Sequence, residues 1–116
     1  MADEITVDIT FKYEKNGVAI TRTKSFNADV AGDSFVHGIQ EVGLTEEAIV
    51  ELTDVGDPGW CFLRNTDATN FIDIGGTGSL NTVLLAGESC VMRLGAALYA
   101  QADTAACDLE YLIVEL

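Results

Sequence analysis

Positive charge is scarce in this sequence. The 116 residues include six Lys and Arg against 19 Asp and Glu, which gives a formal net charge of −13 at pH 7. Proteins bind nucleic-acid phosphates with Lys and Arg that displace counterions, so this balance argues against a nucleic-acid partner. Hydrophobic runs are also short. The chain has no stretch of about 18 apolar residues, the minimum for a membrane-spanning helix, and we expect no membrane partner.

The beginning of the chain offers no sign of a secretory leader. Met1 is followed by Ala-Asp-Glu, whereas a leader has a basic segment followed by an apolar one. Cysteine is infrequent as well: Cys61, Cys90 and Cys107 are widely spaced and form no Cys-x-x-Cys pair. This spacing fits neither a disulfide framework nor a zinc site. Each cysteine has apolar neighbours, so we expect three buried free thiols in a reducing cytosol.

Residues that carry out chemistry are few. His37 is the one histidine, and no local motif accompanies it or a cysteine to make a nucleophile. The glycine-rich segment 75–79 lacks the Lys and the following helix of a phosphate loop. The aspartates do not form an Asp-x-Asp-x-Asp-Gly calcium loop, and adjacent acids are expected by chance in so acidic a chain. We therefore expect no enzyme activity, no catalytic residue, no cofactor and no metal.

The sequence is nevertheless that of a folded protein. Hydrophobic residues make up 48% of it, which excludes intrinsic disorder despite the high charge. A chain of this length buries roughly 65% of its unfolded surface, enough for a core without metals or disulfides. No repeat or linker interrupts it, so we expect one domain over residues 1–116.

The N-terminal quarter predicts a β-hairpin over about residues 4–27. Residues 5–13 alternate apolar and polar without exception, which is the pattern of a half-buried strand. Asn16-Gly17 separates them from a second β-prone run over 18–26, and Asn-Gly is a strong hairpin signal. A two-residue turn would place charges from the second strand on the apolar face. A three-residue bulged loop avoids this by pairing Phe11 with Thr21 and Asp8 with Lys24, and we favour it.

Further short strands follow at regular spacing, separated by polar or glycine-rich turns. The segment 45–52 also has helix-favouring residues, and the turn at 56–59 contains the one proline. We expect strands over 35–42, 45–52, 60–64, 71–74, 80–85, 89–94, 97–100 and 107–115. The sequence therefore predicts an all-β fold, a single antiparallel β-sandwich of jelly-roll type with 8–10 short strands.

A few polar and aromatic residues are candidates for an interface. Four of the six cations lie in the hairpin, and among them Arg22 and Lys24 are candidates for docking on an acidic partner surface. Trp60 and Arg64 are residue types that anchor protein interfaces. An aromatic residue directly after a Pro-Gly turn, however, more commonly plugs one end of a sandwich core. An arginine in so acidic a chain pairs with an internal carboxylate or meets a partner. Asn65 and Asn70 suit turns in which the side chain bonds the backbone.

Two stretches resemble small β-sandwich structural proteins of tailed bacteriophages, among them the capsid cement, or decoration, proteins. One is Gly59-Trp60-Cys61-Phe62-Leu63-Arg64-Asn65-Thr66-Asp67-Ala68-Thr69-Asn70-Phe71-Ile72-Asp73-Ile74-Gly75. The other is Leu84-Leu85-Ala86-Gly87-Glu88, continuing to Leu98-Tyr99-Ala100-Gln101-Ala102-Asp103-Thr104-Ala105. The resemblance covers about the C-terminal half of the chain.

This resemblance implies a non-enzymatic virion component. Such a protein is made in the bacterial cytoplasm and assembles on the shell of major capsid protein, often as a homotrimer. The alternatives are a tail, baseplate or head-tail joining protein with the same fold, or a carbohydrate-binding module. The last would require exposed aromatic residues grouped on one face, and the sequence does not cluster its Trp and Tyr.

Overall fold

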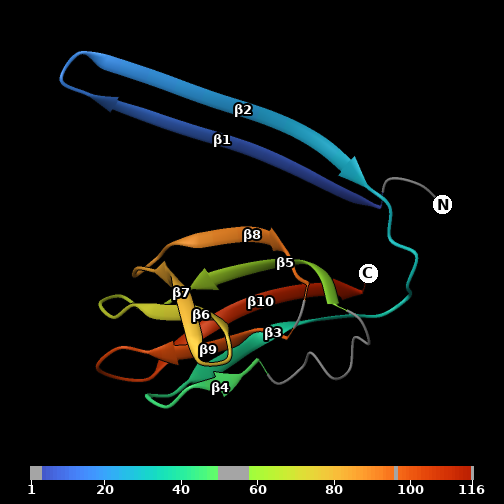
Figure 1. The fold of residues 1–116 in the computed structure, drawn as a ribbon, viewed down its shortest axis with the longest axis vertical. Coiled ribbons are helices and arrows are strands. Elements are labelled where there is room, and N and C mark those ends of the chain that lie inside the picture. The colour runs from blue at the N-terminus through green and yellow to red at the C-terminus, as the bar shows by residue number, and fades with distance from the viewer. Residues whose placement is uncertain (1–3, 50–57, 96, 116) are drawn as a thin grey trace. The chain divides into compact units, whose positions relative to one another are not determined.

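The chain folds entirely into antiparallel β-structure over the residues that the structure, a computed structural model, describes: 4–49, 58–95 and 97–115. These residues form ten strands and no helix (Figure 1). They belong to two compact units, residues 1–31 and residues 32–116. The predicted all-β sandwich with 8–10 strands is confirmed, and the hairpin is a unit of its own.

The first unit is a long two-stranded ribbon. Strand β1 (Ile5–Lys15) pairs with β2 (Val18–Ala28) over eleven residues. Asn16 and Gly17 form the turn with φ of 53° and 81°. These left-handed values identify the type I′ turn, whose twist matches that of the ribbon and which Asn-Gly adopts most readily.

The predicted three-residue loop and its register are therefore wrong. Phe11 pairs with Arg22 and Ile9 with Lys24, so both cations share a face with the apolar residues, and Asp8 pairs with Ser25. The prediction assumed that this face had to be buried and hence free of charge. In the structure Val7 is buried, but the apolar residues beside Arg22 and Lys24 on this face are exposed. The cations there carry little desolvation cost, and the turn's own preference sets the register.

The second unit is a sandwich of two four-stranded sheets. One sheet has the strand order β3-β10-β5-β8, and we call it the BIG sheet because its strands together contain more residues. The other sheet has the order β4-β9-β6-β7, and we call it the SMALL sheet. The BIG sheet consists of β3 (Phe35–Val42), β10 (Cys107–Glu115), β5 (Pro58–Asn65) and β8 (Ser89–Arg93). The SMALL sheet consists of β4 (Glu47–Ala48), β9 (Tyr99–Ala102), β6 (Ile72–Gly76) and β7 (Ser79–Leu84).

The strand order is that of a jelly roll. Strands β6 and β7 form a hairpin, and β5 with β8, β4 with β9 and β3 with β10 pair in turn outside it. The unit is thus one long antiparallel ribbon that is rolled up so that successive pairs alternate between the two sheets. Additional pairings of β10 with β5 and of β6 with β9 complete the sheets.

Most predicted strands are found with shifted ends. Residues 35–42 and 107–115 are strands with the predicted bounds. Strand β6 continues through Gly75 and Gly76, which were predicted as loop; a Cβ at Gly75 would lie 2.5 Å from the Ser79 carbonyl oxygen, so the close return of β7 requires glycine there. Of the segment predicted over 45–52, residues 45–49 are described, and among these Glu47–Ala48 forms a strand. Residues 50–52, and residues 56 and 57 of the predicted turn, lie outside the described residues.

The core lies between the two sheets and is filled by alternate residues of each strand. In β10, Leu109, Tyr111 and Ile113 point inward, as their alternation predicts. They meet Leu63 of β5 and the isoleucines of β6 in one apolar cluster. The other large side chains that are fully buried are Ile49, Ile72, Ile74 and Val42.

Asn65 is the one buried polar residue among the described residues of the chain, and all its polar atoms are satisfied. It ends β5, where the chain leaves the BIG sheet. Its side-chain Nδ2 donates to the carbonyl oxygens of Asn70 (2.9 Å) and Leu84 (3.0 Å), and its Oδ1 accepts from the Asp67 N–H (2.9 Å). Its backbone N–H donates to Glu88 and its carbonyl accepts from Gly87. The predicted turn function of Asn65 is confirmed.

We predict that Asn65→Leu destabilises the sandwich by about 3 kcal/mol, because two carbonyl groups and one N–H lose their partners in a buried site. Urea unfolding of the full chain measures the loss. Asn81→Leu is the matched control: Asn81 is exposed, and we expect a change within about 0.5 kcal/mol. An Asn65→Leu variant as stable as the wild type would contradict the prediction.

Asp67 makes the same loop sensitive to acid. Its Oδ2 accepts hydrogen bonds from the backbone N–H groups of Asn70 (2.7 Å) and Thr69 (3.0 Å), and these bonds lower the pKa of the carboxyl below 3.8. A pKa that is lowered in the folded state adds stability above the unfolded-state pKa, and this stability is lost as the pH falls through the folded-state pKa.

We therefore predict that Asp67→Ala lowers the urea midpoint at about pH 6 and reduces the further fall of that midpoint between about pH 5 and pH 2. The measurement is urea unfolding of both proteins at each pH. Equal acid sensitivity of variant and wild type would show that this carboxylate does not contribute.

Candidate functional site

The four predicted interface residues lie on two exposed sheet faces. Arg22 and Lys24 belong to one face of the hairpin, and Trp60 and Arg64 to the outer face of the BIG sheet. Each face is built by the period-two alternation of its strands, and each is apolar with a few cations. We describe the two faces separately.

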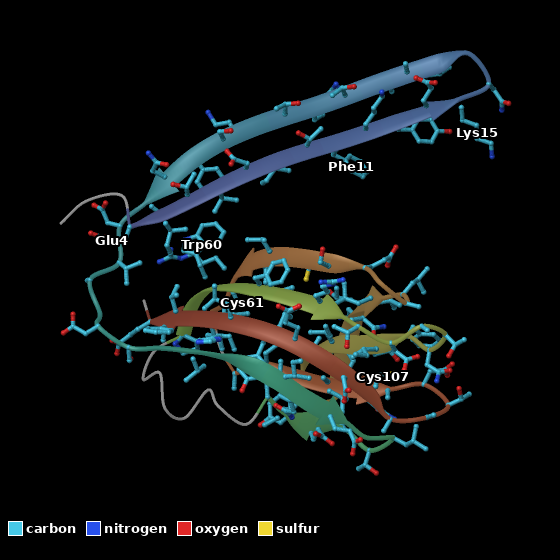
Figure 2. All side chains as sticks on the ribbon, turned by 180° about the vertical axis from the view of Figure 1, so that it is seen from behind. Glu4, Phe11, Lys15, Trp60, Cys61 and Cys107 are labelled. Atoms are coloured by element: carbon cyan, nitrogen blue, oxygen red, sulfur yellow. The ribbon has the colours of Figure 1, made fainter. Side chains whose placement is uncertain are left out.

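The first face, the arm face, is one side of the β1–β2 ribbon. The pairing places Ile9, Phe11 and Tyr13 of β1 on the same side as Ile20 of β2. Phe11 is 71% exposed, the highest value among the large hydrophobic side chains described, and the other three are 45–50% exposed. Figure 2 shows Phe11 and Lys15 on the same side of the ribbon. An apolar surface of this extent is typical of an interaction site.

Charge is divided between the two sides of the ribbon. The arm face carries Lys15, Arg22 and Lys24 and, over residues 5–28, no carboxylate. The opposite side carries both acids of the ribbon, Asp8 and Glu14, among threonines and Lys12; the Ser25 hydroxyl donates to Asp8 at 2.7 Å. The arm face is thus apolar and purely cationic.

The second face, the sheet face, is the outer side of the BIG sheet. One row across the four strands contains His37, Leu112, Phe62 and Val91. The next row contains Ile39, Glu110, Arg64 and Ser89. On the far side of the first row lie Phe35 beside Val114 and Trp60 beside Arg93. Phe35 and Ile39 are about 60% exposed (59% and 65%), and Val91 and Leu112 also belong to the exposed residues.

The polar groups of the sheet face are arranged in pairs. Arg64 Nη1 lies 3.7 Å from Glu110 Oε1, and both side chains are about half exposed, so this ion pair contributes little to stability. The Arg93 guanidinium lies over the Trp60 ring, 5.9 Å from its centroid, a cation–π contact. The rings of Phe35 and His37 are stacked with centroids 5.9 Å apart. Of the two alternatives predicted for Arg64, the structure shows pairing with an internal carboxylate, that of Glu110.

A groove of about 410 Å³ opens on the sheet face. Ile39, Phe62 and Leu112 form its apolar walls, and His37 and Glu110 are its polar walls. Gly38 and Tyr111 lie at its base. A hollow of this size accepts one aromatic side chain, the type of pocket that receives the anchor residue of a protein interface.

All three arginines of the chain lie on these two faces. In residues 32–116, Arg64 and Arg93 are the only Lys or Arg, against 14 Asp and Glu. Arg93 was missed from the sequence, as were Phe11, Phe62 and Leu112. The short apolar run over 60–64 is typical of a buried strand, yet only its alternate residues are buried and the others face outward.

The groups capable of chemistry do not converge. In the described residues no group of three or more His, Cys, Asp and Glu is placed to hold a metal ion, and no helix is long and apolar enough to span a bilayer. The three cysteines are free, and Cys61 and Cys107 are buried while Cys90 is half-buried. Figure 2 shows Cys61 and Cys107 well apart in the sandwich. The loop 65–70 is structural, although Asn70 accepts from the Thr104 hydroxyl (2.7 Å) instead of bonding the backbone with its side chain.

No protein-family model matches the chain, and no curated protein and no solved structure matches it either.

We predict that Cys61 resists alkylation in the folded protein. Burial, with a smaller effect of Cys90, raises the pKa of its thiol to about 12, so at about pH 8 roughly one thiol in ten thousand is ionised, and only the thiolate reacts. Iodoacetamide labelling followed by mass spectrometry of the peptides measures this, with urea-unfolded protein as the control. Labelling of native Cys61 at the unfolded rate would contradict it.

Proposed function

We propose that the protein is a capsid cement, or decoration, protein of a tailed bacteriophage, which binds the shell of major capsid protein and stabilises it without catalysing a reaction. The observation that carries this proposal is the pair of exposed apolar faces, which hold every arginine of the chain, on an eight-stranded jelly roll. Jelly rolls build many viral capsid domains, and interfaces are enriched in aromatic residues and Arg. The resemblance of residues 59–75 and 84–105 to phage structural proteins supports the same conclusion.

The proposed protein acts as a homo-oligomer, with a trimer favoured. Arg22, Lys24, Trp60 and Arg64 belong to its contacts within the virion, with copies of itself or with other virion proteins, because all four lie on the arm face or the sheet face. The rest of the sandwich surface is strongly acidic. That charge suits the outside of a particle whose interior holds DNA, since acidic surfaces do not bind phosphate. The protein is made in the host cytoplasm and ends in the virion.

A tail, baseplate or head-tail joining protein is the alternative within the virion, because such proteins need the same kind of contact face. Cryo-electron microscopy of phage particles that carry a labelled copy separates the possibilities by position. Label on the capsid surface supports a cement protein, and label confined to the tail or the neck contradicts it.

One observation favours a second class, a carbohydrate-binding module. The sheet face groups Phe35, His37, Trp60 and Phe62, and jelly rolls also occur in lectins. However, Trp60 is partly covered by Arg93, which leaves less of its ring for stacking on a sugar. A glycan array with the purified protein tests this class, and specific binding there would replace the proposal.

We predict saturable binding when the purified protein is added to expanded capsids that lack it, with a rise in the temperature at which the capsids disrupt. Arg22→Ala/Lys24→Ala weakens binding more than Lys12→Ala, because Lys12 lies on the opposite side of the ribbon. Sedimentation of capsids with bound protein measures the binding of the wild type and of each variant. Absence of binding at every salt concentration would refute the proposed function.

A further inference from the structure

The arm face needs a surface to cover it. An isolated two-stranded hairpin is marginally stable in water, and stability normally requires a third strand or a packed layer. This ribbon has eleven residues in each strand, yet Ile9, Phe11, Tyr13 and Ile20 on its arm face are 45–71% exposed. The free energy of burying these side chains is therefore available to a binding partner.

The charges of the arm face specify an acidic partner surface. Its three cations face no carboxylate on their own side of the ribbon. Two arm faces packed against each other would bring like charges together, which disfavours pairing through this face alone. The hairpin unit carries four cations and five acids, a net charge of −1, whereas residues 32–116 carry two cations and 14 acids, a net charge of −12. The sheet face of a second copy carries three acids at one end, Glu41, Asp108 and Glu110, and two cations, Arg64 and Arg93. Its acidic end is the part of this surface that matches the cations of the arm face.

The sheet face of a second copy also matches the arm face in shape and polarity. Eleven residues of ribbon span about 36 Å, and the nine residues of β10 span about 30 Å, so the ribbon covers the length of the sheet. Two sheets pack at about 10 Å with their strands roughly aligned. The groove over Gly38 is apolar on most sides, and its charged wall is Glu110, beside Glu41 and Asp108 at the same end of the face.

We propose that the arm face of one copy packs on the sheet face of a second copy, with Phe11 in the groove formed by Ile39, Phe62 and Leu112. Arg22, the cross-strand partner of Phe11, then lies beside the second copy's carboxylates at Glu110 and Asp108. The two surfaces differ, so the contact is head-to-tail, the kind that forms a ring of identical copies when its rotation closes. This inference goes beyond the proposed function, because it requires no capsid.

Light scattering and sedimentation velocity on the full-length protein test the inference. The wild type is expected to be a closed oligomer. Phe11→Asp in the arm face and Ile39→Asp in the sheet face each weaken association about 100-fold or more. Thr10→Asp, on the opposite side of the ribbon, and Val83→Asp, on the SMALL sheet, are matched controls that leave the oligomer intact. Circular dichroism verifies that each variant is folded; Ile39 is 65% exposed, so its substitution spares the core.

Mixing the two defective variants gives a sharper result. The intact arm of the Ile39→Asp copy fits the intact sheet face of the Phe11→Asp copy, so the mixture forms dimers while each variant alone remains monomeric. A monomeric wild type, an unaffected Phe11→Asp variant or a mixture that stays monomeric would overturn the inference. An oligomer that fails to bind capsids would refute the proposed function and leave this inference standing. A monomer that binds them would refute this inference and the proposed homo-oligomer, and leave capsid binding standing.

Discussion

The side-chain amide of Asn65 fixes the place where the ribbon of the sandwich turns from one sheet into the other. The outgoing chain leaves the BIG sheet at the end of β5, and the returning chain leaves the SMALL sheet at the end of β7. Asn65 bonds the Leu84 carbonyl and the loop that follows β5, so both crossings are held by one side chain. The burial of a polar residue here is favourable only because every donor and acceptor has a partner. The position of this bend determines where β5 pairs with β8 and where β10 then pairs with β5. These pairings in turn align the residues of the sheet face in rows.

The second constraint is the placement of the six positive charges. The chain has a net charge of −13, and five of its six cations lie on the two apolar faces. Among the described residues, Arg64 and Glu110 form an ion pair. A neutral apolar surface would associate with many partners, whereas an apolar surface with cations selects acidic ones. Elsewhere on the surface the excess of acidic residues keeps copies of the chain apart.

The sequence predicts the fold better than the interaction surfaces. The bounds of β3 and β10 and the position of the hairpin turn were predicted correctly, because strand-forming runs, alternation and the Asn-Gly pair depend on the residues themselves. The register failed because it depended on an assumption about burial, and burial is a property of the whole assembly. Strand β5 illustrates the same limit: an apolar run does not tell which of its residues, Leu63 or Phe62, faces the core. Arg93 could not be recognised because its position opposite Trp60 requires the pairing of β5 with β8.

The rolled ribbon also sets an order of events during folding. Strands β6 and β7 are neighbours in sequence, and the separation grows for each pair outward, to β3 with β10. Closing an outer pair costs little chain entropy once the inner pair has formed, so the sandwich zips from its centre toward its ends. The N-terminal hairpin, whose contacts are local, needs none of these steps and forms early. A newly made chain can therefore form the turn and register of its arm before β3 and β10 have joined. The uncovered ribbon is only marginally stable, so the arm gains its full stability once the sheet face of another copy is complete and, as we propose, binds it.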